Sequence, residues 1–236
     1  MDYKPKTNLE IFGNLVCGLL VENFPKTFLV GGTVRDILLK REVKDIDIAT
    51  SARPEQAAEI LKNHFIDFNL GFKNLGIVVA KKDSFNATIA TLRREQYSDS
   101  RYPKINFVND PKIDSQRRDF TINALYLSAK TGKILDFHSG MKDLKAKKIR
   151  FVGEPLKKIS QDPLRIIRAL RFALELGFKI EKQSFLAIKK SFTAINLLSK
   201  SRLETEVLKL KDLKKQNFLR GALKAEKNLD KYFKSR

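Results

Sequence analysis

The amino-acid sequence predicts an α/β domain followed by a helical segment. Three observations predict it. Short apolar runs at residues 28–30, 76–80 and 84–92 are typical of buried strands. Apolar residues at helical spacing over residues 8–23 predict a helix that packs on these strands. From Leu156 onward only the helical spacing remains, so we expect a domain boundary near residue 153.

Composition restricts the class of protein. The chain has 236 residues, of which 42% are hydrophobic, enough for one large or two small domains. Its formal net charge of +20 favours a polyanionic partner, and nucleic acid is the first candidate, although the Lys residues are also compatible with a solvated surface. Cys17 is the only cysteine, which excludes an intrachain disulfide and a cysteine-ligated zinc site.

The sequence shows no signal of a membrane. Its N-terminus lacks an apolar signal core, and no run approaches the 18 apolar residues of a spanning helix. We therefore expect a soluble, cytoplasmic protein that does not contact a membrane.

The segment that follows the first predicted strand combines a turn and a helix. Gly31 and Gly32 end the apolar run 28–30, and glycine lets backbone approach a phosphate without a Cβ in the way. Thr33 is expected to cap the short helix that comes next.

Two carboxylates follow closely. In a strand, Asp45 and Asp47 share one face, and adjacent carboxylates repel each other unless a cation lies between them. Mg²⁺ is the usual cation, bound through carboxylates and substrate phosphates. The alternative is an ordinary turn and a solvated strand face, but the two signals together favour a phosphate turn beside a metal site.

The next elements are predicted from local pattern alone. Residues 54–63 form a helix with Pro54 in its first turn. Residues 65–69, 76–80 and 84–92 form strands, with a hairpin at residues 81–83 between the last two. Residues 93–114 are long, polar and without period, which predicts a flexible catalytic loop or a disordered excursion.

A pair of arginines forms the second strong signal. Arg117 and Arg118 bring two permanent charges to one point just before a predicted helix, and the guanidinium fork suits phosphate and ribose contacts. Asp119 is alternatively a helix N-cap, and Arg117 alternatively forms a surface salt bridge.

A third signal lies in the helical segment. Asp162 and Arg165 are three residues apart and project from one helix face. A carboxylate accepts from the amino group of cytosine or adenine, and a guanidinium donates to the ring nitrogen. Uracil and guanine would leave the carboxylate unpaired, at a cost of about 1–3 kcal/mol. The alternative is that Asp162 caps the helix, with Pro163 in the first turn.

These motifs resemble the class II nucleotidyltransferases, which comprise tRNA CCA-adding enzymes and bacterial poly(A) polymerases. The resemblance lies in LVGGTVRD at residues 29–36, DID at 45–47, RRDFTINAL at 117–125 and QDPLR at 161–165. Residues 134–144, with Asp136 and Gly140, resemble the strand, glycine turn and short helix of the family. The resemblance implies a catalytic head with a mixed, mainly antiparallel sheet over residues 1–153 and an all-helical neck over residues 154–236.

The family's activity is then expected here: template-independent addition of CMP and AMP to the 3′ end of tRNA, with CTP, ATP and two Mg²⁺ ions. Asp45 and Asp47 would be the catalytic metal ligands, and Asp36 would help to shape the triphosphate pocket. The nucleotide-binding residues implied by the resemblance are Gly31, Gly32, Arg35, Arg118, Asp119, Asn123, Asp162, Arg165, Arg168 and Arg171.

The chain departs from the family pattern at three points. Thr88 and Gln161 stand where the family usually has Glu. Arg202, Glu206 and Lys209 have the spacing of a later family motif, and we interpret them as helix-supporting ion pairs. The sequence stops soon after them, so we expect the body and tail domains of the family to be absent. Two alternatives stay open: a poly(A) polymerase, and a truncated or split RNA-binding product that has little activity alone or needs a second chain.

Overall fold

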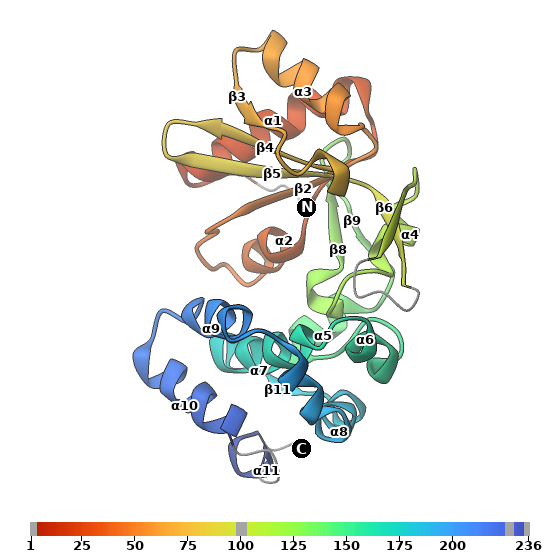
Figure 1. Ribbon diagram of the computed structural model, residues 1–236. Helices are drawn as coiled ribbons and strands as arrows, with labels where there is room; N and C mark the ends of the chain where they lie inside the picture. Colours follow the sequence, from red (N-terminus) through yellow and green to blue (C-terminus); the bar gives the residue numbers. More distant parts are fainter. Residues whose placement is uncertain (1–3, 98–102, 225–228, 234–236) are drawn as a thin grey trace. The chain divides into compact units, whose positions relative to one another are not determined.

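The computed structural model describes residues 4–97, 103–224 and 229–233 (Figure 1). The chain divides into two compact units. The first, which we call the head unit, comprises residues 1–118 and 122–140, and the second, the helical unit, comprises residues 119–121 and 141–236. The chain changes unit earlier than the expected boundary at residue 153. The assignment of a catalytic and a nucleotide-selecting domain stays a prediction.

The head unit is built on a seven-stranded sheet with the order β3-β4-β5-β2-β1-β8-β9. Its neighbouring strands are antiparallel except β2 and β5, which run parallel, so the predicted mixed, mainly antiparallel sheet is confirmed. The strands are β1 (Thr27–Val30), β2 (Ile46–Thr50), β3 (Asp67–Asn69), β4 (Ile77–Lys82), β5 (Phe85–Thr91), β8 (Leu125–Ser128) and β9 (Ile134–Asp136).

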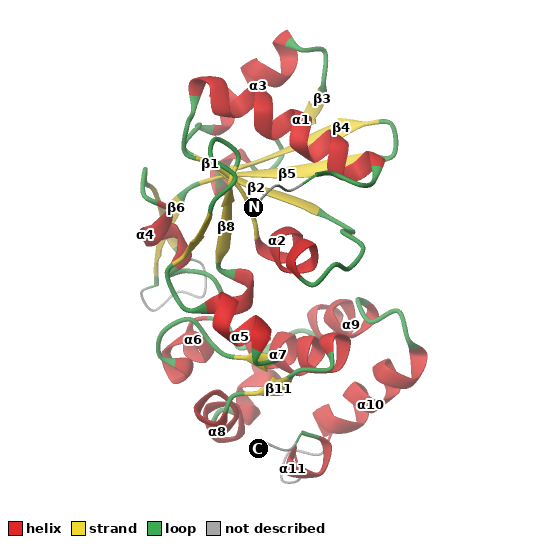
Figure 2. Ribbon diagram, turned by 180° about the vertical axis from the view of Figure 1, so that it is seen from behind, coloured by secondary structure: helices red, strands yellow, loops and turns green. Residues whose placement is uncertain are grey.

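Helices cover both faces of this sheet. Figures 1 and 2 show α1 (Asn8–Asn23) and α3 (Pro54–Asn63) on one face and α2 (Gly31–Leu38) on the other. The side chain of Thr7 caps α1 by accepting a hydrogen bond from the backbone N–H of Glu10 at 3.2 Å. The helix predicted at residues 8–23 is therefore confirmed. A short 3₁₀ turn, η1 (Lys73–Leu75), precedes β4.

Residues 93–114 contain more structure than the sequence predicts. Strands β6 (Arg93–Gln96) and β7 (Lys104–Phe107) pair as an antiparallel hairpin, and α4 (Pro111–Ser115) follows. The alternative of a disordered excursion is therefore wrong for these described residues, and the flexible catalytic loop stays a prediction. Residues 98–102 of that segment lie outside the described residues. Nor does a helix follow the two arginines: the short 3₁₀ turn η2 (Thr121–Asn123) leads directly into β8.

The helical unit also contains one short strand pair. β10 (Lys148–Ile149) and β11 (Lys179–Ile180) are parallel, because Gly177, with φ +67°, turns the chain back after α7. The backbone N–H groups of Lys179 and Glu181 then donate to residues 147 and 149. The helices are α5 (Gly140–Lys145), α6 (Pro155–Gln161), α7 (Leu164–Leu176), α8 (Lys182–Lys190), η3 (Phe192–Leu197), α9 (Lys200–Leu208), α10 (Leu213–Lys224) and α11 (Leu229–Tyr232).

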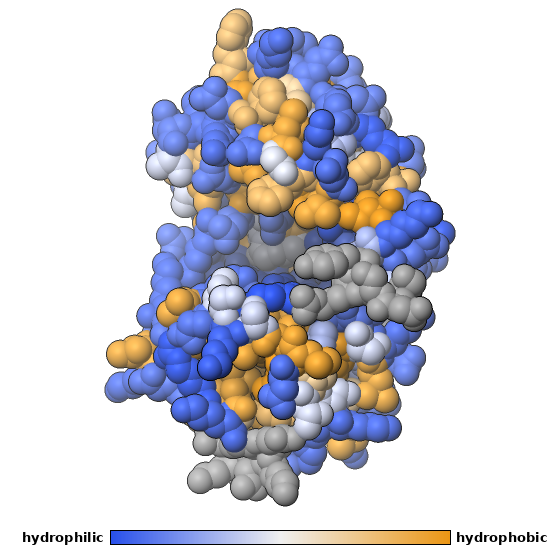
Figure 3. Space-filling view, viewed as in Figure 1, coloured by the Kyte–Doolittle hydropathy of each residue, from blue (hydrophilic) through white to orange (hydrophobic). Residues whose placement is uncertain are grey.

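The surface agrees with the basic composition. Hydrophilic side chains cover much of the face drawn in Figure 3, with apolar side chains exposed among them. In the part of the chain that the structure describes, no helix is long and apolar enough to cross a membrane.

Two glycines of α1 provide a test of the packing on β2. A Cβ at Gly13 would lie 2.8 Å from Ile46 Cγ2, whereas a Cβ at Gly18 would meet nothing within 4 Å. We expect Gly13→Ala to lower the free energy of unfolding by about 1 kcal/mol, since overpacking outweighs the helix propensity of alanine. Gly18→Ala should raise it by about 0.5–1 kcal/mol. Urea denaturation measures both changes in the free energy of unfolding. A Gly13→Ala variant that is more stable than wild type would contradict the close packing of Gly13 on Ile46.

Candidate functional site

The glycine turn approaches a carboxylate of the neighbouring strand. Gly31 follows β1 directly and has φ +67°, a conformation that glycine adopts without strain. A Cβ built on Gly31 would lie only 3.1 Å from Asp47 Oδ2, so any side chain at this position would fill the space beside the carboxylate. The structure thus brings the predicted turn and one predicted metal ligand together.

Asp45 and Asp47 lie at the start of β2. Asp45 precedes the first residue of the strand and is exposed, and Asp47 is half-buried on the strand itself. Thr88 on β5 pairs in register with Asp47, so the residue that departs from the family pattern lies directly across from this carboxylate. Among the described residues, no cluster of three or more His, Cys, Asp or Glu is arranged to hold a metal ion.

This donor set fits magnesium. Mg²⁺ is a hard cation that commonly binds through one or two carboxylates and completes its shell with water and substrate phosphates. Two aspartates that flank one strand residue supply such ligands, and the missing side chain at Gly31 keeps the position beside the Asp47 carboxylate free of a Cβ.

Thr33 does not cap α2 as predicted. The N-cap of this helix is Val30, and no side chain bonds to the exposed N–H groups there. Thr33 Oγ1 instead donates to the carbonyl of Asp45 at 2.9 Å and accepts from the backbone N–H of Asp47 at 2.8 Å.

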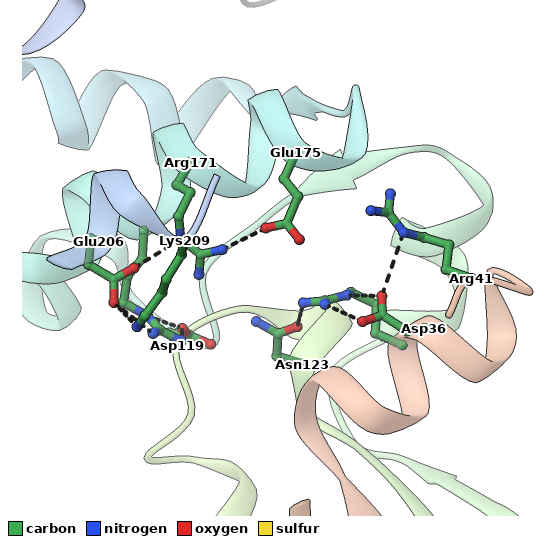
Figure 4. A network of polar contacts seen from close by, with 10 residues as sticks. Asp36, Arg41, Asp119, Asn123, Arg171, Glu175, Glu206 and Lys209 are labelled. Carbon is green, nitrogen blue, oxygen red and sulfur yellow. Dashed lines mark hydrogen bonds and ion pairs between the residues drawn. The ribbon is translucent and has the colours of Figure 1, made fainter. Parts of the chain in front are cut away.

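Arg35 is held by two polar partners within the head unit. Its Nε and Nη2 donate to the two carboxylate oxygens of Asp36 at 2.9 and 2.8 Å, and Nη1 donates to Asn123 Oδ1 at 2.9 Å. Figure 4 labels the two partners, Asp36 and Asn123. A Cβ at Gly32 would lie 3.4 Å from Arg35 Nη2, so the glycine turn rests against the same group.

Arg118 lies beside the glycine turn, and two buried side chains bind its guanidinium. A Cβ at Gly31 would lie 3.6 Å from Arg118 Nη1. Arg118 Nε donates to the hydroxyl of Tyr126 at 2.7 Å, and that hydroxyl donates to Asp114 Oδ2 at 2.6 Å. Asp114 and Tyr126 are fully buried, so they hold the arginine in one orientation. No sequence pattern predicts these two partners of Arg118, because only the fold brings α4 and β8 together.

Arg117 contributes to the same cluster. Its Nε donates to Asp114 Oδ1 at 2.8 Å, and its Nη1 lies 3.6 Å from Glu95 Oε1 on the β6–β7 hairpin. Arg117 therefore forms salt bridges, but with a fully buried carboxylate and not at the surface as the alternative predicts.

The electrostatics of this cluster favour the ionised acid. Burial opposes ionisation of Asp114, but the charges of Arg117 and Arg118 outweigh it and lower the pKa of Asp114 to about 2. Burial also opposes the charge on Arg118, yet Tyr126 and Asp114 raise its pKa above the ordinary value. Both groups are charged at neutral pH.

A second buried network lies in the helical unit. Arg168 Nε and Nη2 donate to Asp119 Oδ2 at 2.8 and 2.6 Å, while Asp119 Oδ1 accepts from the backbone N–H of Phe120 at 2.7 Å. Asp119 is the main cause of the raised pKa of Arg168. The structure therefore pairs two predicted site residues, and Asp119 also makes a local contact with the backbone.

Glu206 joins this network in a role that the sequence did not reveal. It is only 3% exposed and contacts Arg171 Nε at 2.9 Å, Arg168 Nη1 at 3.6 Å and Lys209, as Figure 4 shows for the labelled partners. Arg171 also pairs with Glu175 at 2.6 Å. The predicted support between Glu206 and Lys209 exists, but the main partners of Glu206 lie on α7.

The predicted base-selecting pair is held by contacts with neighbouring helices of the helical unit. Arg165, which is 6% exposed, donates through Nη1 to the carbonyl of Lys158 at 2.7 Å and to Gln161 Oε1 at 3.0 Å. Asp162 Oδ1 accepts from the backbone N–H of Leu164 at 3.2 Å and from Arg202 Nη2 at 3.3 Å. The N-cap of α7 is Pro163, so Asp162 is not the N-cap that the alternative predicts and instead ends α6. Gln161 thus keeps a hydrogen bond to Arg165 despite its neutral side chain.

Comparisons with known proteins agree with this geometry. A family model described as the Poly A polymerase head domain matches residues 27–150. The CCA-adding enzyme of Lactococcus lactis subsp. lactis (strain IL1403) is 40% identical over 193 residues, which are 81% of this chain and 48% of that enzyme. The chain spans about half the length of the curated relatives it matches.

Two solved structures are similar over nearly the whole chain. A CCA-adding enzyme from Bacillus stearothermophilus in complex with CTP has a TM-score of 0.79 at 29% identity and covers 97% of this chain and 54% of its own. A tRNA nucleotidyltransferase complexed with a primer tRNA and an incoming ATP analog has a TM-score of 0.72 at 29% identity and covers 94% of this chain and 62% of its own.

Asp114 provides a pH-dependent test of its ion pairs with Arg117 and Arg118. Its folded-state pKa of about 2 lies below the ordinary value, so the charged group stabilises the fold above about pH 4 and stops doing so as the pH falls through 2. We expect Asp114→Asn to lower the free energy of unfolding by about 3 kcal/mol at pH 7 and by progressively less between pH 4 and 2. Urea denaturation across this range measures the difference, with exposed Asp67→Asn as control. A difference in free energy of unfolding between wild type and Asp114→Asn that does not change with pH would contradict the role of the charge.

Proposed function

The chain belongs to the family of the Poly A polymerase head domain, and on this premise we propose that it is a template-independent nucleotidyltransferase. We propose CMP and AMP addition to the 3′ end of tRNA as its reaction. The relatives support this proposal through their names and the CTP and tRNA complexes of the solved structures. Within the chain, the observation that carries it is the close approach of Gly31 to Asp47, where a Cβ would lie 3.1 Å from the carboxylate oxygen.

Asp45 and Asp47 are the proposed ligands of two Mg²⁺ ions. When bound, Mg²⁺ activates the RNA 3′-hydroxyl and neutralises charge on the departing pyrophosphate. The contribution of the chain is to fix the two carboxylates. Asp47 is placed by the register of β2 with β5, and Asp45 is placed through Thr33.

The triphosphate is proposed to bind at the glycine turn. Gly31 and Gly32 form the first turn of α2, where backbone N–H groups and the helix dipole favour an anion. Arg118 adds a fixed positive charge beside this turn, since Tyr126 and Asp114 anchor it from the other side. Arg35, Asp36 and Asn123 shape the adjoining wall through their mutual hydrogen bonds.

The base is proposed to be selected by Asp162 and Arg165 in the helical unit. A carboxylate and a guanidinium together match the amino group and ring nitrogen of cytosine or adenine, and they leave uracil and guanine with an unpaired group. Gln161 orients Arg165 through its amide oxygen. Asp119, Arg168 and Arg171 contribute by bracing the helices around this pair.

The RNA partner is proposed from charge. The net charge of +20 favours a polyanion, and tRNA is the partner that a CCA-adding reaction requires. Such an enzyme would act in the cytoplasm.

Single-nucleotide incorporation tests this proposal. Purified protein with Mg²⁺ and tRNA lacking its CCA end receives one labelled nucleoside triphosphate per reaction. We expect CMP addition, then AMP addition once two C residues are present, and no GMP or UMP. Asp47→Asn should reduce incorporation on the order of 10³-fold, because it removes a metal ligand and its charge. Asp67→Asn, an exposed carboxylate of the same unit, should have no effect.

Other outcomes would contradict parts of the proposal. Addition of AMP alone, to any RNA end, would favour a poly(A) polymerase. Nucleotide binding without incorporation would favour a split enzyme that needs a second chain. Full activity of Asp47→Asn would exclude the metal assignment.

A further inference from the structure

We propose that Thr33 is a positioning residue that joins the triphosphate turn to the metal-binding strand. This inference rests on the proposed function and names how that site is held together. Thr33 contacts neither the substrate nor the metal in this account. Its hydroxyl acts through the backbone of Asp45 and Asp47.

The geometry at the start of β2 carries the argument. β1 and β2 are paired only as far as Leu29 and Ile48. Val30, the last residue of β1, still pairs with Tyr126 of β8, and the chain then enters α2 at Gly31. On this edge, residues 45–47 therefore extend beyond the last paired residue of β1. The Thr33 hydroxyl supplies what a strand would have supplied there: a donor for the carbonyl of Asp45 at 2.9 Å and an acceptor for the N–H of Asp47 at 2.8 Å.

Thr33 is well placed for such a role. It is 1% exposed, so water does not compete for its hydroxyl. It lies in the first turn of α2, next to Gly31 and Gly32, and its one proton and one acceptor position are both used. Any movement of the glycine turn is thereby transmitted to the backbone of both proposed metal ligands.

The consequence is a defined spacing of the two carboxylates. Asp45 lies outside the strand and is exposed, so the β-ladder alone does not fix it. Without the hydroxyl, the peptide groups around Ile46 lose two hydrogen bonds, and the spacing of the two side chains is no longer set. Partners that orient metal ligands typically contribute 10–100-fold to metal affinity.

A matched control separates positioning from general stability. Thr27 at the other end of β1 is also buried, and its hydroxyl likewise makes two hydrogen bonds, to the carbonyl of Phe24 at 2.7 Å and to the hydroxyl of Thr50 at 2.8 Å. Thr27→Val thus removes an equivalent hydroxyl from the same strand–helix region without touching Asp45 or Asp47.

The experiment measures Mn²⁺ binding directly, by electron paramagnetic resonance titration of the full chain without nucleotide. We expect Thr33→Val to weaken Mn²⁺ binding about 10-fold or more, and Thr33→Ala, measured in parallel, to do the same. Thr33→Ser keeps the hydroxyl and should restore the wild-type affinity. Thr27→Val should lower the melting temperature and leave Mn²⁺ affinity unchanged.

Two results would overturn the proposal, and they are distinguishable. If Thr33→Val and Thr33→Ala lower only the melting temperature, as Thr27→Val does, then Thr33 is a structural residue and the inference fails while the proposed function stands. If wild type and Asp47→Asn bind Mn²⁺ equally, the metal site itself is absent, and the proposed function fails together with the inference.

Discussion

The close approach of backbone at Gly31 to the carboxylate of Asp47 is the constraint on which the rest of the site depends. It requires a positive φ, the absence of a Cβ, and a strand pair in which β1 ends where β2 begins to carry acidic side chains. These requirements bring the N-terminus of α2, which is the proposed triphosphate site, and the two proposed metal ligands into one supersecondary unit. The surrounding residues serve to keep these two features in place.

Each unit keeps its arginines in place with a buried carboxylate. Asp114 in the head unit contacts Arg117 and Arg118, and Glu206 in the helical unit contacts Arg168 and Arg171. A buried carboxylate is tolerated only with such partners, and each partner in turn loses its freedom to reorient. The basic residues that the motifs single out therefore act partly as substrate ligands in our proposal and partly as the frame of their own unit.

Local patterns predicted the elements that have a strong period or a clear end. The helix at residues 8–23, the strand before Gly31 and the helix at 54–63 are all found. The β6–β7 hairpin was missed because its strands are polar and only half-buried on one side, so they lack the apolar alternation of a strand. β11 has only two residues, too few for a pattern.

The site was predictable where its residues are adjacent in sequence. Motifs identified Asp45 and Asp47 together, but the partners of Arg118 and Arg168 come from elements far along the chain and leave no local signal. Thr33 shows the limit most clearly, because its residue type is equally suited to a helix cap and only the fold decides that its hydroxyl is used on β2 instead.

The most direct measurement is CTP binding, with and without Mg²⁺, to wild type and to Gly31→Ala. Gly153→Ala is the matched control, since Gly153 also has a positive φ, +72°, but a Cβ there would meet nothing within 4 Å. We predict that Mg²⁺ strengthens CTP binding to wild type and to Gly153→Ala and that this gain is lost in Gly31→Ala. A Gly31→Ala variant that keeps the full Mg²⁺-dependent gain would contradict a shared site for triphosphate and metal.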